Sequence, residues 1–201
     1  MEKIFYQGKE LLPPRQHLAL KAIFGTEKGK GLLAAFLRDV LSMDVEKAED
    51  VTLLNNEIFE EYDGNKQIAP DLRVRTSNND YINIEIHLAE REDIIPRSMY
   101  YHANLVASQE SWKKGNPDRS RAISLFILDF ILFPEEEVWY NEYKFGCEDG
   151  EELTDLSMIS FLELPKVRKA CQGKEALSAS ECWGLFLSAR DGEVMEMLKK
   201  Q

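Results

Sequence analysis

The residues best suited to chemistry lie in two neighbouring segments in which polar and apolar side chains alternate. Asp71 begins the first segment, and Glu85 and His87 lie in the second. Two carboxylates and a backbone carbonyl are hard oxygen ligands that Mg²⁺ and Mn²⁺ accept, and such an ion can activate water and stabilise charge on a phosphodiester. These residues form a candidate catalytic site, and the alternative is an ordinary wet face of an antiparallel sheet.

The pairing of the two segments decides whether Asp71 and Glu85 can meet. Opposed residues on antiparallel strands have a constant index sum, and the two carboxylates share a face only if that sum is even. An even sum also gathers the apolar residues of both segments on one face: Leu72, Val74, Ile82, Ile84, Ile86 and Leu88. A three-residue loop at 77–79, with two asparagines suited to left-handed backbone, gives an even sum and places Asp71 directly opposite Glu85.

Elements on both sides of this hairpin must hold it in place. Helical spacing of apolar residues predicts two helices before it, and a proline in a first turn marks a third helix after it. The predicted order is α, α, β, β, β, α, β, β, β, α, which indicates an α/β fold with a mixed sheet. The ranges outside the hairpin are Gln16–Phe24, Gly29–Met43, an extended segment at 51–59, Pro96–Trp112, Ala122–Phe133, Val138–Phe145, Leu156–Leu164 and a helical tail from Ser180.

The segment Ala122–Phe133 is so continuously apolar that a strand there must be covered on both faces. We therefore predict an interior strand with a neighbour on each side. Asp129 interrupts the apolar run, so we expect it near a strand end or paired with a polar group. His102 has no evident partner in the sequence and is interpreted as a partly exposed helix residue.

The composition excludes several classes of protein. The chain has 201 residues, which suits one domain over residues 1–201 and is too short for two full-size domains. Hydrophobic residues at 44% and charged residues at 30% exclude a disordered chain. Three cysteines without paired spacing fit a reducing compartment, and no segment has the pattern of a signal peptide or a membrane span. We expect a cytoplasmic protein without a membrane partner.

The net charge is −11, from 36 acidic and 25 basic residues, which argues against nucleic-acid binding by bulk charge. Residues 39–70 carry 9 acids and 2 bases, and residues 134–163 carry 10 acids and 1 base. Residues 1–38 are basic, with 7 bases and 3 acids, and residues 71–133 are nearly balanced. Any approach of a phosphate is therefore expected at these last two regions.

Sequence motifs for other chemistries are incomplete or absent. The glycine-rich stretch at 25–31 has too few residues between its glycines for a phosphate loop, has no Ser or Thr after the lysine and follows a helix. The sequence also has no HExxH and no GxSxG pattern, so zinc-peptidase and serine-hydrolase interpretations have no support.

Six local patterns, in this order, resemble the PD-(D/E)xK nuclease superfamily, and more narrowly its recombination-promoting nuclease and transposase family. Together they cover about residues 15–190. The patterns are H-L-A-L-K-A-I-F-G at 17–25 with the helix at 32–41, Pro70-Asp71, I-E-I-H at 84–87, R-S-M-Y-Y at 97–101, F-L-E-L-P-K at 161–166 and W-G-L-F-L at 183–187.

The resemblance implies a restriction-endonuclease-like αβββαβ core, a divalent metal such as Mg²⁺ or Mn²⁺, and cleavage of DNA in proteins linked to bacterial mobile elements. By position, Asp71 and Glu85 would be metal ligands and the carbonyl of Ile86 a third. Two residues depart from the family pattern: His17 stands where the family has an acid, and His87 where it has Gln and the superfamily has Lys. A neutral imidazole suits softer divalent metals or a general base near pH 7.

Two functions therefore stay open. The first is a metal-dependent DNA endonuclease with Asp71, Glu85 and His87 as catalytic residues. The second is a degenerate member that binds DNA or a protein partner without cleaving, which His17, His87 and the acidic net charge favour. Arg97 is interpreted as a contact of a phosphate or of the active-site carboxylates, or as half of a structural ion pair at the start of a helix. A homodimer is also left open.

Overall fold

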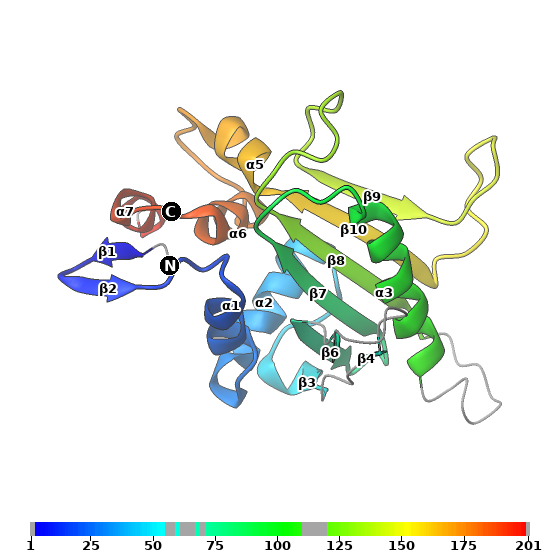
Figure 1. Cartoon of the computed structure of the whole chain (residues 1–201). Coiled ribbons are helices and arrows are strands. Elements are labelled where there is room, and N and C mark those ends of the chain that lie inside the picture. The colour runs from blue at the N-terminus through cyan, green and yellow to red at the C-terminus, as the bar shows by residue number, and fades with distance from the viewer. Residues whose placement is uncertain (1–2, 55–58, 61–66, 69–70, 110–119, 200–201) are drawn as a thin grey trace.

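A six-stranded mixed sheet runs through the computed structural model, with helices on both of its faces (Figure 1). The structure describes residues 3–54, 59–60, 67–68, 71–109 and 120–199. The strand order is β3-β6-β7-β8-β10-β9, in which β7, β8 and β10 are parallel and the other pairs are antiparallel. The strands are β3 (Val51–Leu53), β6 (Leu72–Thr76), β7 (Tyr81–His87), β8 (Ala122–Leu128), β9 (Tyr140–Lys144) and β10 (Ser157–Glu163).

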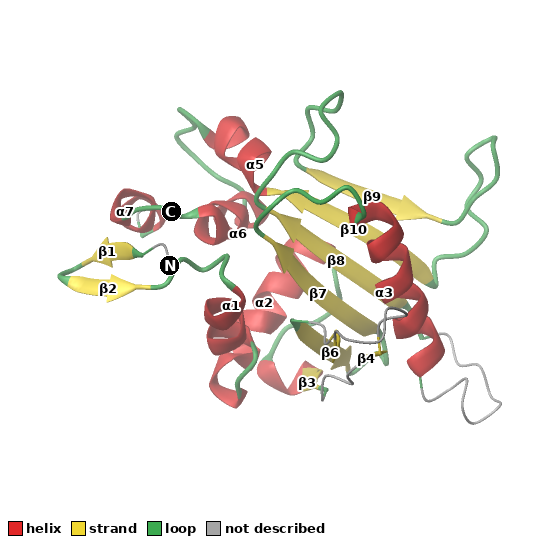
Figure 2. Cartoon of the chain, in the orientation of Figure 1, coloured by secondary structure: helices red, strands yellow, loops and turns green. Residues whose placement is uncertain are grey.

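The helices divide between the two faces of this sheet (Figure 2). The apolar side chains of α1, α2, α5 and α6 pack with those of β6, β7 and β8 in the main core, whereas α3 packs on the opposite face. The helices are α1 (His17–Phe24), α2 (Lys30–Leu41), α3 (Ile94–Ser108), α5 (Leu164–Cys171), α6 (Ala179–Ser188) and α7 (Gly192–Leu198). The α/β class and the flanked mixed sheet that the sequence predicts are therefore confirmed.

Strand periodicity explains this division. Residues with even numbers in β6 and β7, such as Val74 and Ile84, enter the main core, and each is fully buried. Residues with odd numbers point to the face that α3 covers, where Tyr81 packs against Leu105. The candidate site residues Asp71, Glu85 and His87 have odd numbers, so the pleat directs them toward the α3 side.

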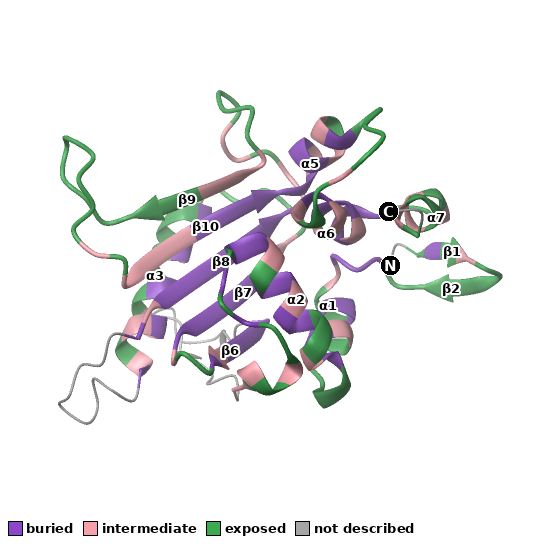
Figure 3. Cartoon of the chain, turned by 180° about the vertical axis from the view of Figure 1, so that it is seen from behind, coloured by how far each residue is buried: buried purple, intermediate pink, exposed green. Residues whose placement is uncertain are grey.

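Strand β8 lies between β7 and β10, as its apolar run predicts, and all seven of its residues are buried (Figure 3). The predicted end at Phe133 is wrong, because β8 ends at Leu128. Asp129 follows directly and forms ion pairs with Arg15 and Arg168. The chain leaves the sheet where this buried carboxylate finds charged partners, which agrees with both placements expected for Asp129.

Several elements differ from the sequence-based ranges. The predicted helix Pro96–Trp112 begins earlier, at Ile94, and ends at Ser108, while Trp112 lies outside the described residues. Helix α5 was not predicted, and neither were two short hairpins. One hairpin is β1 (Ile4–Tyr6) with β2 (Lys9–Leu11), and the other is β4 (Phe59–Glu60) with β5 (Gln67–Ile68). Hairpin β1–β2 lies beside α7, so the two ends of the chain are neighbours (Figure 1).

No helix in the described part of the chain is long and apolar enough to cross a membrane.

Candidate active site

Asp71 and Glu85 come together across the β6–β7 hairpin in the even register that the apolar residues predict. Leu72 pairs with Ile84, so the preceding residue Asp71 comes opposite Glu85. The loop at 77–79 contains Asn79 in the left-handed conformation, with φ of 65°. The Asp71 backbone N–H donates to the Glu85 carboxylate. Loop length and strand pattern therefore suffice to bring these two carboxylates to one face.

The carboxylate of Asp71 has two partners in the structure. The backbone N–H of Ile86 donates to its Oδ2 over 3.0 Å. Nδ1 of His17, the first residue of α1, lies 2.8 Å from each of its two oxygens. The hydrogen bond to Asp71 raises the pKa of the His17 imidazole above its ordinary value. His17 is half exposed, so it forms the solvent side of the site.

Glu85 is buried, with 4% of its surface exposed, and among the described residues its Oε1 has no hydrogen-bond partner. Burial raises the pKa of this carboxyl well above its ordinary range, and the negative charge of Asp71 raises it further. A buried carboxylate beside a second one, with an unused oxygen, is unfavourable without a cation. This arrangement is therefore the strongest local indication of a site that takes up positive charge.

His87 ends β7 with a neutral imidazole. Its ring stacks on Phe126 at 6.0 Å between ring centroids, and its buried Nε2 has no partner among the described residues. Burial lowers the pKa of His87 to about 4, and the charge of Arg97 acts in the same direction. At neutral pH the ring therefore has one nitrogen lone pair available to accept a proton or to bind a metal.

The carbonyl of Ile86 points toward the same place. The neighbouring His87 carbonyl accepts from Asp129 N–H over 2.9 Å, so it faces β8. Successive carbonyls in a strand point to opposite edges, which directs the Ile86 carbonyl to the β6 edge, where Asp71 lies. Pro70, the other half of the predicted Pro70-Asp71 pattern, lies outside the described residues.

These groups suit a hard divalent cation. The carboxylates of Asp71 and Glu85, with the unused Oε1 of Glu85, offer oxygen ligands, and the Ile86 carbonyl lies at the same edge. The described residues contain no group of three or more His, Cys, Asp or Glu side chains arranged to hold a metal ion. A cation here would therefore be completed by backbone oxygen and water, as is usual for Mg²⁺.

Two basic residues direct positive charge toward these carboxylates. The charges of Arg97, on α3, and Lys21, one turn after His17 on α1, both lower the pKa of Glu85, against the larger raising effects. Arg97 donates to the hydroxyl of Tyr101 over 3.2 Å and lies over its ring. The sequence analysis did not single out Lys21, although its spacing of four residues from His17 places both on one helix face.

The polar face of the β6–β7 hairpin is not exposed to solvent. Helix α3 covers it, and Asn83 is completely buried there, while Arg73 donates to Ser108 at the end of α3. The prediction of a partly exposed His102 is also wrong. Its Nδ1 lies 2.9 Å from the Ser124 hydroxyl and its Nε2 lies 2.6 Å from the Ser157 hydroxyl. The wet-face alternative is therefore excluded for this part of the sheet.

A buried ion pair follows the end of β10. Lys166 Nζ lies 2.6 Å from Glu163 Oε2 and donates to the carbonyl of Phe133 over 2.7 Å. The backbone N–H groups of Leu132 and Phe133 both donate to Glu163 Oε1. These contacts hold the chain after β8 against the sheet, so the E-L-P-K pattern has a structural role here.

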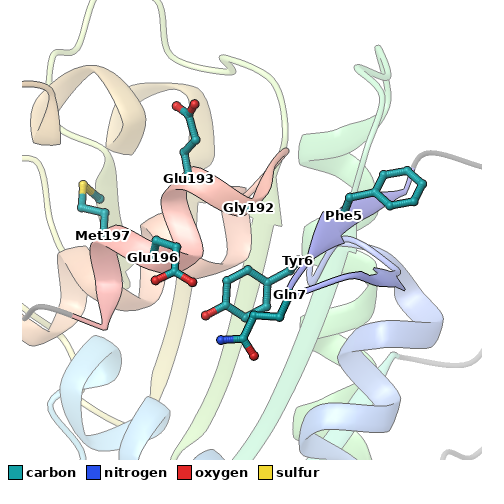
Figure 4. Close-up of a pocket in the computed structure, with 7 residues that line it drawn as sticks. All are labelled: Phe5, Tyr6, Gln7, Gly192, Glu193, Glu196 and Met197. Carbon is teal, nitrogen blue, oxygen red and sulfur yellow. The ribbon is translucent and has the colours of Figure 1, made fainter.

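The described cavities lie away from the carboxylates. A cavity of about 630 Å³ between hairpin β1–β2 and α7 is lined by Phe5, Tyr6, Gln7, Gly192, Glu193, Glu196 and Met197 (Figure 4). A second cavity of about 230 Å³ lies between α3 and the strands β9 and β10, and its lining includes Met99, Tyr143 and Phe161. Neither cavity is lined by Asp71 or Glu85.

The residues of this arrangement, from His17 to Lys166, all fall within the match to one family. The model of the family described as PD-(D/E)XK nuclease family transposase matches residues 14–201. Searches of curated proteins and of solved structures found no match. The local patterns noted in the sequence therefore agree with a match over most of the chain.

Proposed function

Because this chain belongs to the PD-(D/E)XK nuclease family transposases, we propose that it is a metal-dependent DNA endonuclease that hydrolyses phosphodiesters and is linked to mobile elements. The observation that carries the proposal is the pair Asp71 and Glu85, in which a buried carboxylate keeps an oxygen without a partner among the described residues. A single domain over residues 1–201, a cytoplasmic location and a homodimer stay predictions.

The proposed roles follow from the geometry of the side chains. Asp71 and Glu85, with the Ile86 carbonyl, would hold one Mg²⁺ or Mn²⁺. When bound, the cation supplies charge neutralisation at the phosphate and a water of lowered pKa. Hydrolysis would add the water oxygen to phosphorus and break one P–O ester bond. Nε2 of His87, neutral but a weak base because its pKa is about 4, would accept the proton of that water, and the leaving alkoxide would take a proton from solvent.

The second candidate is a degenerate member that binds DNA or a protein without cleaving it. The contact that favours it is the imidazole of His17, whose Nδ1 lies against both oxygens of Asp71. A ring in that place competes with a metal for the same carboxylate. Endonuclease activity therefore requires that the His17 imidazole move away from Asp71, or that the imidazole and the metal share the Asp71 carboxylate.

Incubation of supercoiled plasmid DNA with purified protein separates the two candidates. We expect nicking and linearisation in Mn²⁺ or Mg²⁺, none in chelator, and a loss of at least about 10²-fold in Asp71→Ala and Glu85→Ala. A folded protein that binds DNA but cleaves it in no metal supports the degenerate member. Equal cleavage by wild type and Asp71→Ala indicates a contaminant or a different site.

A further inference from the structure

Three arginines from distant parts of the chain converge on Asp129, at the end of β8. Arg15 Nε lies 3.0 Å from Asp129 Oδ2, and Arg168 Nη1 lies 3.2 Å from Oδ1. Arg190 Nη2 lies 3.1 Å from Oδ2 and 3.2 Å from Oδ1. We call these four residues the Asp129 cluster. Three guanidinium groups share one carboxylate, so the cluster carries excess positive charge within an acidic protein.

The Asp129 cluster lies next to the candidate active site. The Asp129 N–H donates to the carbonyl of His87, and Arg15 is only two residues before His17, which contacts Asp71. Two residues of chain span at most about 7 Å between Cα atoms. The end of β7 and the segment 15–17 therefore position both the Asp129 cluster and the candidate active site. Figure 1 shows the segment before α1, the loop after β7 and the end of α6 gathered at this end of the strands.

The inner and outer arginines differ in exposure. The side chain of Arg15 is 3% exposed, and its Nη1 also donates to the carbonyl of Ala189 over 2.7 Å. The side chains of Arg168 and Arg190 are 31% and 51% exposed. Arg15 and Asp129 already form a buried ion pair, which gives the buried carboxylate its cation. The charges of Arg168 and Arg190 at the surface are therefore not needed to stabilise the fold.

The neighbouring acid, Asp191, forms no ion pair with the Asp129 cluster among the described residues. Asp191 follows Arg190 directly, but its carboxylate accepts from the backbone N–H groups of Glu193 and Val194 and caps α7. The planar fork of arginine matches a phosphate group and can donate to it in a bidentate manner. In a chain with a net charge of −11, a local site of this kind is the way to hold a nucleic-acid backbone.

We propose that Arg168 and Arg190 bind a backbone phosphate of DNA adjacent to the phosphodiester that is cut. This inference rests on the proposed function, because it assigns a second contact between the protein and the DNA that it is proposed to cleave. Arg15 and Asp129 act beneath it as a positioning pair that fixes the directions of the outer guanidinium groups. Helix α5 and the segment before α7 thereby contribute the contact surface, and Arg15 of the N-terminal segment supports it from beneath.

The test measures DNA binding by the full-length protein in chelator, so that no cleavage occurs. Anisotropy of a labelled 20-base-pair duplex is followed at several salt concentrations for wild type, Arg168→Gln, Arg190→Gln and the double variant. We expect each single change to weaken binding about three- to tenfold and to lower the salt slope by about one. Arg190→Lys should keep the salt slope, because it keeps the charge, while losing part of the affinity.

Arg38→Gln is the matched control, because it removes the same charge from a half-exposed side chain that pairs with Asp39 on α2. It should not change the salt slope. The inference is overturned if Arg168→Gln and Arg190→Gln bind DNA like Arg38→Gln, or if the wild type does not bind duplex DNA. Thermal unfolding identifies any variant that fails to fold, and Arg190→Lys then decides the outcome.

The failure of this inference is distinguishable from the failure of the proposed function. In Mn²⁺, Arg190→Gln should cleave with a KM for DNA raised by about the factor by which its binding is weakened, whereas Asp71→Ala should bind DNA with unchanged salt slope and not cleave. Cleavage that depends on Asp71 without any effect of Arg168 or Arg190 on binding overturns only the phosphate site.

Discussion

Nδ1 of His17 lies 2.8 Å from each carboxylate oxygen of Asp71, so the imidazole faces the edge of the carboxylate that a metal ligand uses. In the family pattern an acid stands at this position. An acid could share a cation with Asp71, whereas a hydrogen-bonded imidazole must first release the oxygens. We therefore expect the residue at position 17 to control how readily Asp71 takes up a metal.

His17→Asp should lower the Mg²⁺ concentration needed for half-maximal plasmid cleavage by about tenfold, the scale of effects from residues that support metal ligands. The reason is that a hard oxygen ligand replaces a competing nitrogen. Calorimetric titration with Mg²⁺ checks the affinity without relying on activity. Lys28→Asp, on an exposed residue of the following turn, controls for the added negative charge. An unchanged Mg²⁺ affinity in His17→Asp would contradict the role that we assign to position 17.

His87 should make the proposed DNA cleavage faster in Mn²⁺ than in Mg²⁺, because Mn²⁺ accepts nitrogen ligands more readily. His87→Ala should lower the Mn²⁺-supported rate by about 10²-fold, which is the lower end for loss of a general base. His87→Lys, which keeps a group able to accept a proton, should keep or raise the Mg²⁺-supported rate, whereas His87→Gln removes the base and should lose rate in both metals. Initial rates of plasmid nicking in each metal give the comparison. A wild-type preference for Mg²⁺, with His87→Gln as active as the wild type, would contradict this view of the position.

The sequence pattern predicts the hairpin well because the determinants of its register are local. Alternation of period two in β6 and β7, with a short loop that ends in Asn79, specifies the pairing of Asp71 with Glu85. The buried partners of His102 were not predictable in the same way. Ser124 and Ser157 lie 22 and 55 residues away along the chain, and only the packing of α3 across the sheet brings them to the ring.

The Asp129 cluster shows the same limit. The sequence predicts that Asp129 needs a polar partner but does not identify Arg190, which is 61 residues away. That a phosphate approaches residues 1–38 or 71–133 stays a prediction, and the sequence did not single out the C-terminal Arg168 and Arg190. Net charge by segment averages Arg168 and Arg190 with the acids around them, and it does not reveal that two arginines meet in space.

The Glu85 carboxyl should make the metal-free protein less stable as the pH rises. Its pKa is raised by burial, so the folded state holds a proton that the unfolded chain releases in the ordinary carboxyl range. The free energy of unfolding therefore falls as the pH rises through and above that range. Glu85→Gln cannot ionise and should raise this free energy at pH 8 by roughly 1 to 3 kcal/mol, while DNA cleavage is lost.

Urea unfolding in chelator at pH 5 and pH 8 checks the effect of Glu85→Gln. Glu152→Gln, which replaces an exposed carboxylate paired with Lys144, is the control and should change little at either pH. The expected pattern is a gain for Glu85→Gln that is larger at pH 8 than at pH 5. A gain of equal size at both pH values would mean that ionisation of Glu85 is not its cause.

Lys166→Met should destabilise the fold strongly, because it leaves the fully buried Glu163 carboxylate without its cation. Removing one partner of a buried ion pair typically costs about 3 to 5 kcal/mol, whereas an exposed pair contributes at most about 1 kcal/mol. Lys144→Met, which breaks the exposed pair with Glu152, is the matched control. Urea unfolding at pH 7 measures both changes. Adding Glu163→Gln to Lys166→Met should recover part of the loss, because the unpaired charge is then removed. Similar small losses in Lys166→Met and Lys144→Met would show that the chain after β8 is held by its other contacts instead of by this ion pair.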